Sequence, residues 1–360
     1  MAYQMAPKAE QLSPYDPIEG EYRIRLDANE SFLLPTEEDR KKLAQAAAEV
    51  ALNRYPDPLA RDLCTAFAKR YSIDPDLVTA GNGSDELISV ILSTFLQKGE
   101  KVLTLSPDFS MYRFYTALTE TPCIVLEKGE DFRIDVDVVL DTLQRENIRL
   151  LIFSNPCNPT SIGLEAVEVR RLLKGTDALV VLDEAYMDFW DQSLLPEVAE
   201  YDNLIILRTC SKAIGLAALR LGFAVANSRL TAVIRAAKSP YNVNAVTQEM
   251  ARILLENKHY AEVYPDLLVA SRDMLIAGLK KLESDGALQK VWDSCTNFAY
   301  IRLEGARWIF ERLADNGIIV RCFGDHFLRI TAGTQAENSE LLASLRYLLR
   351  YRKEHPEAAE

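Results

Sequence analysis

The sequence predicts an α/β protein in which a large domain with a mostly parallel central sheet is joined to a smaller α/β domain. The chain has 360 residues, more than one average domain needs. Its middle part alternates short, almost continuously apolar runs with helical patterns, as in a parallel sheet covered on both faces. Strands are expected over residues 101–105, 150–153, 178–182, 204–207 and 222–225.

The flanking elements predict the domain boundaries. Thr36 and Asp39 are typical of a helix start, so we expect a helix from there to about residue 50. A long helical segment is expected over 246–282, followed by strands over 298–303, 318–321 and 327–331. Helices are expected over 306–316, with Gly317 as its stop, and over 339–352. We predict an N-terminal arm (1–25), an N-terminal part of the small domain (26–52), the large domain (53–245), and a connecting helix with the C-terminal small domain (246–360).

Composition excludes several classes of protein. Hydrophobic residues make up 48% of the chain, which is typical of a globular fold, and the net charge of -12 argues against nucleic-acid binding. The six cysteines form no C-x-x-C pair, and the three histidines are too dispersed for a metal site. Neither a signal peptide nor an apolar run of roughly 20 residues is visible. We expect a soluble, cytoplasmic enzyme with reduced thiols and no metal.

Lys212 is the first candidate for chemistry. It follows the apolar run 204–207, and ligands of open α/β sheets bind at the carboxyl ends of strands. The Ser211 hydroxyl precedes it, and Arg220 follows eight residues later, so a phosphate would find a donor and a positive charge nearby. Because a lysine can form a Schiff base with an aldehyde, these residues together predict pyridoxal 5'-phosphate (PLP) as cofactor.

Three further motifs follow or precede predicted elements in the same way. Asp183 ends the run 178–182 and can pair with a cationic ring nitrogen, and Tyr186 lies three residues later. Asn155-Pro-Cys-Asn-Pro-Thr160 follows the strand over 150–153 and predicts a rigid turn. Gly81-Asn-Gly-Ser-Asp-Glu86 precedes a helical pattern, so its N–H groups can face an anion. Each motif alone also fits an ordinary structural role, as a helix cap, core tyrosine or turn.

The order and spacing of these motifs resemble the histidinol-phosphate aminotransferase family of fold-type I PLP-dependent transferases, over residues 12–333. The resemblance implies that Lys212 carries PLP, that Asp183 pairs with its ring nitrogen, and that Asn158 and Tyr186 contact the ring oxygen O3'. It also implies that Phe109 stacks on the ring. Tyr112 is expected in the core, with a role as a supporting neighbour of the ring as the alternative. The residues implied at the cofactor phosphate are Ser84, Asp85, Ser211, Arg220 and, from the neighbouring subunit of a homodimer, Tyr55.

The same resemblance implies a set of substrate-binding residues. Arg329, in Leu-Arg-Ile-Thr, would clamp an acid group of the substrate with its planar guanidinium, and Arg321 is a second candidate. Asn29 and Tyr15 belong to the segment that covers the substrate. Ser161 replaces the glycine usual in the family, and a turn shifted toward Gly163 is an alternative.

The resemblance implies a histidinol-phosphate:2-oxoglutarate aminotransferase of histidine biosynthesis, with Lys212, Asp183 and Tyr186 as catalytic residues. Two alternatives of the same fold are threonine-phosphate decarboxylase of cobalamin biosynthesis and an aromatic amino-acid aminotransferase. The decarboxylases tend to carry Pro-Gly before the phosphate-binding arginine, where this chain has Gly215-Leu-Ala-Ala-Leu, which favours transamination. A PLP-binding transcription regulator would need an N-terminal DNA-binding domain, for which the roughly 25 residues before Leu26 are too few.

Overall fold

The computed structural model describes residues 3–10, 12 and 18–355. Its largest sheet has seven strands in the order β2-β8-β7-β6-β5-β3-β4. Only β8 runs antiparallel to its neighbours, so the predicted mostly parallel sheet is confirmed. The strands are β2 Val78–Gly81, β3 Lys101–Ser106, β4 Cys123–Glu127, β5 Ile148–Ser154, β6 Leu179–Asp183, β7 Leu204–Thr209 and β8 Gly222–Ala226.

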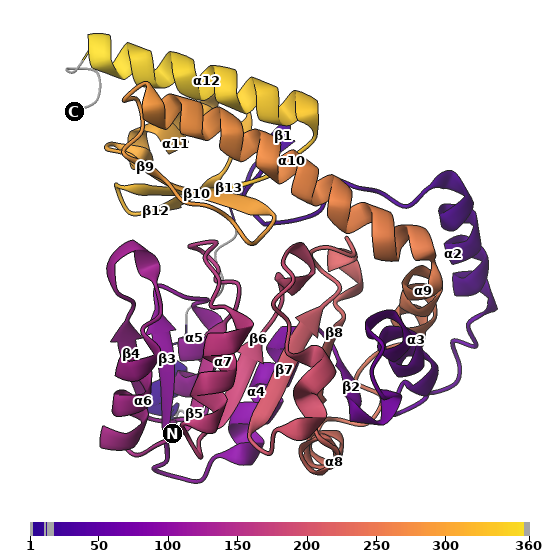
Figure 1. Ribbon diagram of the computed structural model, residues 1–360. Coiled ribbons are helices and arrows are strands. Elements are labelled where there is room, and N and C mark those ends of the chain that lie inside the picture. The colour runs from indigo at the N-terminus through magenta and orange to yellow at the C-terminus, as the bar shows by residue number, and fades with distance from the viewer. Residues whose placement is uncertain (1–2, 11, 13–17, 356–360) are drawn as a thin grey trace.

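Helices cover both faces of this sheet (Figure 1). Successive residues of β5 point to opposite faces, because side chains alternate along a strand. Leu151 and Phe153 therefore belong to one apolar core, and Leu150 and Ile152 to another. The covering helices are α3 Arg61–Tyr71, α4 Ser84–Phe95, α5 Met111–Leu118, α6 Val136–Arg145, α7 Ala166–Lys174, α8 Ser228–Ala237 and α9 Ala245–Glu256. Short 3-10 helices lie at Pro75–Leu77, Glu130–Phe132, Met187–Phe189, Leu195–Glu200 and Ala217–Leu219.

A second body lies above the carboxyl edge of the large sheet (Figure 1). It holds an antiparallel sheet in the order β12-β13-β10-β9 and a parallel pair, β1 with β11. Ile24 and Leu26 join its apolar core, whereas Leu43 packs into the core of the large body. Its elements, and the two N-terminal helices, are α1 Pro7–Glu10, β1 Ile24–Arg25, α2 Glu37–Glu49, α10 Lys258–Ser284, β9 Lys290–Val291, β10 Phe298–Arg302, α11 Ala306–Asp315, β11 Ile318–Ile319, β12 Arg321–Phe323, β13 Phe327–Thr331 and α12 Gln335–Glu354.

Several element boundaries differ from the prediction. The helical segment over 246–282 is two helices, because Asn257 ends α9 and caps α10 by accepting a hydrogen bond from the His259 amide. The strand over 318–321 divides into β11 and β12. The last helix begins four residues earlier than expected, at a capping box that Thr334 and Glu337 form. Strands β2 and β4 were not predicted, and the domain boundaries stay a prediction.

The parallel strands end at one edge, and this positions the candidate residues. Asp183 is the last residue of β6, and Lys212 follows β7 by three residues. Both therefore lie at the edge that faces the second body. Among the described residues, no helix is long and apolar enough to cross a membrane.

Candidate active site

One cavity of about 470 Å³ lies between the carboxyl edge of the large sheet and the small antiparallel sheet. Almost all of the residues predicted from the sequence line it. These are Asn29, Ser84, Asp85, Phe109, Asn158, Asp183, Tyr186, Ser211, Lys212, Arg220, Arg321 and Arg329. Tyr55 lies outside this cavity: it is 81% exposed and stacks on Tyr241. Tyr15 falls outside the described residues.

Lys212 lies inside this cavity as a partly buried amine. Its Nζ donates a hydrogen bond to the Ala28 carbonyl at 3.1 Å, and it lies 5.9 Å from the centre of the Tyr186 ring. Burial, aided by the positive charge of Arg329, lowers the pKa of Lys212 from 10.5 to about 8. An amine of this pKa is partly neutral near neutral pH, and the neutral form is the nucleophile and the base.

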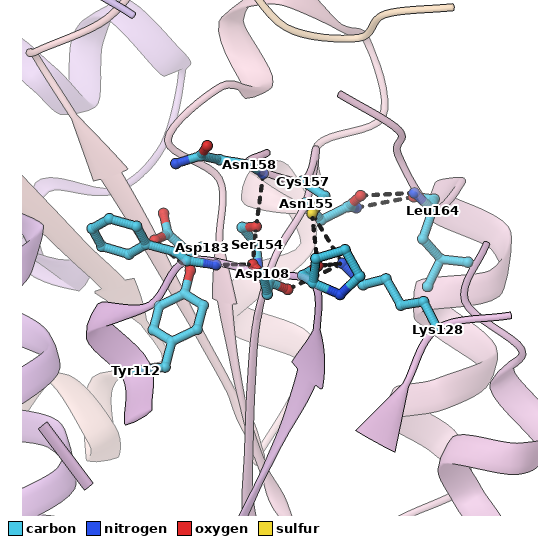
Figure 2. A network of polar contacts seen from close by, with 11 residues as sticks. Asp108, Tyr112, Lys128, Ser154, Asn155, Cys157, Asn158, Leu164 and Asp183 are labelled. Atoms are coloured by element: carbon cyan, nitrogen blue, oxygen red, sulfur yellow. Dashed lines mark hydrogen bonds and ion pairs between the residues drawn. The ribbon is translucent and has the colours of Figure 1, made fainter. Parts of the chain in front are cut away.

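Asp183 is almost fully buried at the end of β6. The Tyr112 hydroxyl donates to its Oδ2 at 2.8 Å (Figure 2), and the Ala185 amide donates to its Oδ1 at 3.1 Å. Burial raises its pKa to about 7, against the stabilising hydrogen bond from Tyr112. Tyr112 is fully buried, as expected of a core residue, but it also contacts Asp183 and the edge of the Phe109 ring, at 5.6 Å. A carboxylate held in this way favours a cationic partner.

The N-terminus of α4 forms an anion cradle at one end of the cavity. Gly83 precedes the helix at φ +84, and a Cβ there would approach the Arg220 guanidinium at 3.1 Å. Arg220 Nη2 lies 3.5 Å from Asp85, whose Oδ1 is buried without a hydrogen-bond partner. Gly222 lets β8 pass close to α4, because a Cβ would meet the Ser84 amide at 2.6 Å. The helix N-terminus and the guanidinium together suit a phosphate.

Three successive residues of the N-terminal segment each contact one residue of the cavity. The Asp27 carbonyl accepts from Arg329 Nη2 at 2.5 Å, and the Ala28 carbonyl accepts from Lys212. The Asn29 amide donates from Nδ2 to the Tyr186 hydroxyl at 2.8 Å. Asp27 and Ala28 act here through backbone carbonyls, which any residue supplies, so the sequence held no signal for them.

Arg329 forms the other charged end of the cavity. It lies on β13, where Nη1 donates to Asn158 Oδ1 at 2.5 Å. Its guanidinium lies 5.4 Å from the Phe298 ring centre and 5.8 Å from that of Phe323. Arg321 is its direct neighbour across the β12–β13 pair. Two arginines on neighbouring strands repel one another unless an anion lies between them, so this end favours an acidic ligand.

The loop after β5 keeps the turn that glycine usually makes. Ser161 is buried and itself adopts φ +65, in the left-handed region, so the turn is not shifted toward Gly163. Its hydroxyl lies within hydrogen-bond distance of the carbonyls of Thr160, at 2.5 Å, and Asp293, at 3.2 Å. The serine therefore compensates for its strained backbone with a contact to the second body.

A buried polar network beneath the cavity was not predicted. Asp108, Lys128 and Cys157, in the loops that follow β3, β4 and β5, lie side by side with Ser154, the last residue of β5 (Figure 2). Asp108 and Ser154 also line the cavity. Asp108 directly precedes Phe109 in the sequence and carries no pattern of its own.

Comparison with known proteins agrees with this geometry. The family model for aminotransferases of class I and II matches residues 22–345. The histidinol-phosphate aminotransferase of Clostridium novyi (strain NT) is 41% identical over 333 residues, which are 91% of this chain and 92% of that protein. The chain belongs to the histidinol-phosphate aminotransferase family. It is thus a PLP-dependent aminotransferase of fold-type I.

Solved structures show how widely this fold is shared. The histidinol-phosphate aminotransferase from Sinorhizobium meliloti, in complex with pyridoxal-5'-phosphate, superposes with a TM-score of 0.86 at 24% identity, over 98% of this chain and 99% of that one. L-threonine-O-3-phosphate decarboxylase from Porphyromonas gingivalis gives 0.74 at 24% identity, over 91% and 99%. Because both enzymes have the fold, the fold alone does not decide the reaction.

The cavity of this aminotransferase fits PLP at three points. Lys212 supplies a partly neutral amine for the aldehyde. The start of α4 and Arg220 form a positively polarised cradle that suits a phosphate, and a Cβ at Gly83 would lie 3.1 Å from the Arg220 guanidinium and narrow it. Asp183 is a buried carboxyl that needs a cationic partner, and the ring nitrogen of PLP is one.

Proposed function

We propose that this aminotransferase transfers the amino group of L-histidinol phosphate to 2-oxoglutarate, in histidine biosynthesis. The observation that carries the proposal is a single cavity with a reactive lysine between two separate cationic ends. The Arg220 end suits the phosphate of PLP, and the end with Arg321 and Arg329 suits an anionic group of the substrate. The family relatives supply the identity of the donor.

The residues that would hold the cofactor divide by the part they contact. We assign Ser84, Asp85, Ser211 and Arg220 to its phosphate, Phe109 to one face of its ring, and Asn158 and Tyr186 to O3'. Asp183 would hold the ring nitrogen protonated, and Tyr112 supports this carboxylate with its hydrogen bond. When bound, PLP supplies the electron sink that makes a hydrogen on the substrate Cα acidic.

Lys212 is then the group that moves the proton. Its lowered pKa leaves a neutral amine available near neutral pH, which can remove the proton from Cα as a base and return it to the cofactor carbon C4' as an acid. The Ala28 carbonyl accepts a hydrogen bond from the same nitrogen and fixes its position. A group with a pKa near the working pH suits both halves of this transfer.

Arg329 would bind the two substrates in turn. Its planar guanidinium matches the carboxylate of glutamate and the phosphate of histidinol phosphate equally well. The Asn158 side chain and the Asp27 carbonyl hold it from two sides, and Phe298 and Phe323 flank it. Arg321 adds charge beside it, and Asn29 and Tyr15 would cover the substrate from the N-terminal segment.

We also propose that the working unit is a cytoplasmic homodimer. Leu52 and Tyr55, three residues apart in sequence, are 85% and 81% exposed, and Leu34 is 72% exposed. Exposed apolar side chains of this size are typical of an interface. In the dimer, Tyr55 would reach the cofactor phosphate of the partner subunit. The six free thiols fit a reducing compartment.

The half-reaction with single amine donors tests the proposed donor. The purified PLP-loaded enzyme is mixed with L-histidinol phosphate, glutamate, phenylalanine or O-phosphothreonine, and the visible absorbance of PLP is followed. We expect conversion to the pyridoxamine form with histidinol phosphate, faster than with phenylalanine, and also with glutamate. Release of CO2 from O-phosphothreonine would instead assign the decarboxylase reaction. Conversion by glutamate with none by histidinol phosphate would refute the donor but keep transamination.

A further inference from the structure

Lys128 and Asp108 form an almost completely buried ion pair next to the cavity. Their side chains are 1% and 2% exposed, and Lys128 Nζ lies 3.3 Å from Asp108 Oδ2. Taking two charges out of water costs much of what their attraction returns, so such a pair contributes little to stability beyond what an apolar pair would. Stability alone therefore does not explain why this ion pair is present beneath the cavity.

Asp108 connects the two loops that carry residues proposed to touch the PLP ring. Its Oδ1 accepts a hydrogen bond from the Phe109 amide at 2.8 Å. The same carboxylate accepts from the hydroxyl of Ser154, and the Ser154 oxygen accepts from the Asn158 amide at 3.2 Å. One carboxylate therefore fixes the backbone at Phe109 and, through Ser154, the backbone at Asn158. Figure 2 shows Asp108, Ser154 and Asn158 in this arrangement.

Lys128 connects the same two loops from the opposite side. Its Nζ donates to the Pro107 carbonyl at 2.9 Å and lies 2.9 Å from the Cys157 sulfur. Pro107 is two residues from Phe109, and Cys157 is next to Asn158. Burial opposes the charge of Lys128, but Asp108 and Cys157 outweigh it, so the pKa of the ammonium is raised and the charge is kept. The pair thus works as a charged clamp across two loops.

We propose that the Lys128–Asp108 pair is a positioning device for PLP, which sets the distance between Phe109 and Asn158. Neither side chain is assigned to the cofactor itself, so both act through the residues they hold. The inference rests on the proposed roles of Phe109 and Asn158. The ring of PLP would lie between the loop that carries Phe109 and the loop that carries Asn158. Both loops must be held in place, because loops move more easily than the strands of the sheet.

Lys128→Met tests the clamp, with Ser154→Ala as a milder variant that breaks only the link from Asp108 to Asn158. Lys101→Met is the control, because Lys101 pairs with Glu146 at 3.2 Å at the start of β3, the opposite end of that strand from Asp108. PLP is removed from each purified protein and titrated back, with tryptophan fluorescence as the signal. The visible circular dichroism of the bound PLP reports the orientation of its ring, and thermal melting of the PLP-free protein reports stability.

We expect PLP affinity to fall about tenfold or more in Lys128→Met and several-fold in Ser154→Ala, with altered visible dichroism in both and unchanged behaviour in Lys101→Met. Lower melting temperatures with unchanged affinity and dichroism would overturn the inference, because the pair would then be structural only. If Lys128→Met does not fold, Ser154→Ala decides alone, and an unchanged affinity overturns it. A wild-type protein that binds no PLP would overturn the proposed function as well.

Discussion

Asp183→Asn is expected to stabilise the PLP-free protein at alkaline pH. Burial raises the pKa of Asp183 from 3.8 to about 7. A carboxyl group whose pKa is higher in the folded state binds its proton more tightly there, so its ionisation opposes folding increasingly as the pH rises from about 4 to 7. Asparagine keeps the shape of the side chain, and the Tyr112 hydroxyl can turn to accept a hydrogen bond from the new amide. The substitution therefore removes the cost of the charge and keeps the contact.

The size of the effect follows from the pKa. Each pKa unit corresponds to about 1.36 kcal/mol, so a rise from 3.8 to about 7 is worth about 4 kcal/mol once Asp183 is ionised in both states. Asp183 is only 4% exposed, so solvent screens little of this energy. The free energy of unfolding should rise by about 4 kcal/mol at pH 8, by about 2 kcal/mol at pH 5, and not at all near pH 3.

Urea unfolding of the PLP-free protein at pH 5 and pH 8 measures this difference. Asp202→Asn is the control, because the Asp202 side chain is 94% exposed and should change nothing. Asp183→Asn, in contrast, should lower the transamination rate about 100-fold or more, because the ring nitrogen of PLP loses its carboxylate partner. A variant no more stable than the wild type at pH 8, or equally stabilised at both pH values, would refute the argument.

Three further predictions concern Lys212, Arg329 and Tyr55. Lys212→Ala should abolish transamination. In the wild type, the rate at which the PLP-free protein combines with PLP should rise up to pH about 8 and then level off, because only the neutral amine reacts. Stopped-flow absorbance measures this rate, and a plateau reached only near pH 10.5 would contradict the lowered pKa of Lys212. Arg329→Gln should raise KM for glutamate by about 100-fold, because the substrate loses charged hydrogen bonds to the guanidinium. An unchanged KM in steady-state kinetics would show that Arg329 does not bind the substrate. Tyr55→Phe should weaken PLP affinity by about fivefold, because one hydrogen bond to the cofactor phosphate is lost. An unchanged affinity in a PLP titration would rule out this contact across the subunits.

Much of the cavity could be predicted because its residues stand next to strong local patterns. Asp183 and Lys212 each follow an almost continuous apolar run, and parallel strands bring their carboxyl ends together. Ser84 is the first residue of α4, and Gly81 and Gly83 before it are typical of a turn that leads into a helix. A strand end thus predicts both the fold and the place of the side chain.

Most of the parts that were not predicted lack a local pattern. Strand β4 is different: its residues 123–126 are all apolar, but the strand lies at the edge of the sheet, is only partly buried, and is followed by none of the predicted site residues. Asn257 divides two helices without a glycine or proline to mark the break. Asp108 and Lys128 are 20 residues apart in the chain, and only the pairing of β3 with β4 brings their loops together. Contacts of this kind depend on tertiary structure.

The contacts of the N-terminal segment have a consequence for the order in which the enzyme is completed. Ile24 pairs with Ile318, and the Asn29 amide donates to the Thr331 hydroxyl at 3.0 Å. Residues 24–29 leave the ribosome long before their partners Ile318 and Thr331. The seven-stranded sheet can form meanwhile from strands that are close in sequence, whereas Lys212 meets the Ala28 carbonyl only after the chain has closed on itself. Catalytic activity therefore requires the complete fold. A chain that ends before residue 318 still contains Lys212, but it lacks β11, the strand that pairs with β1 and holds the Ala28 carbonyl in place.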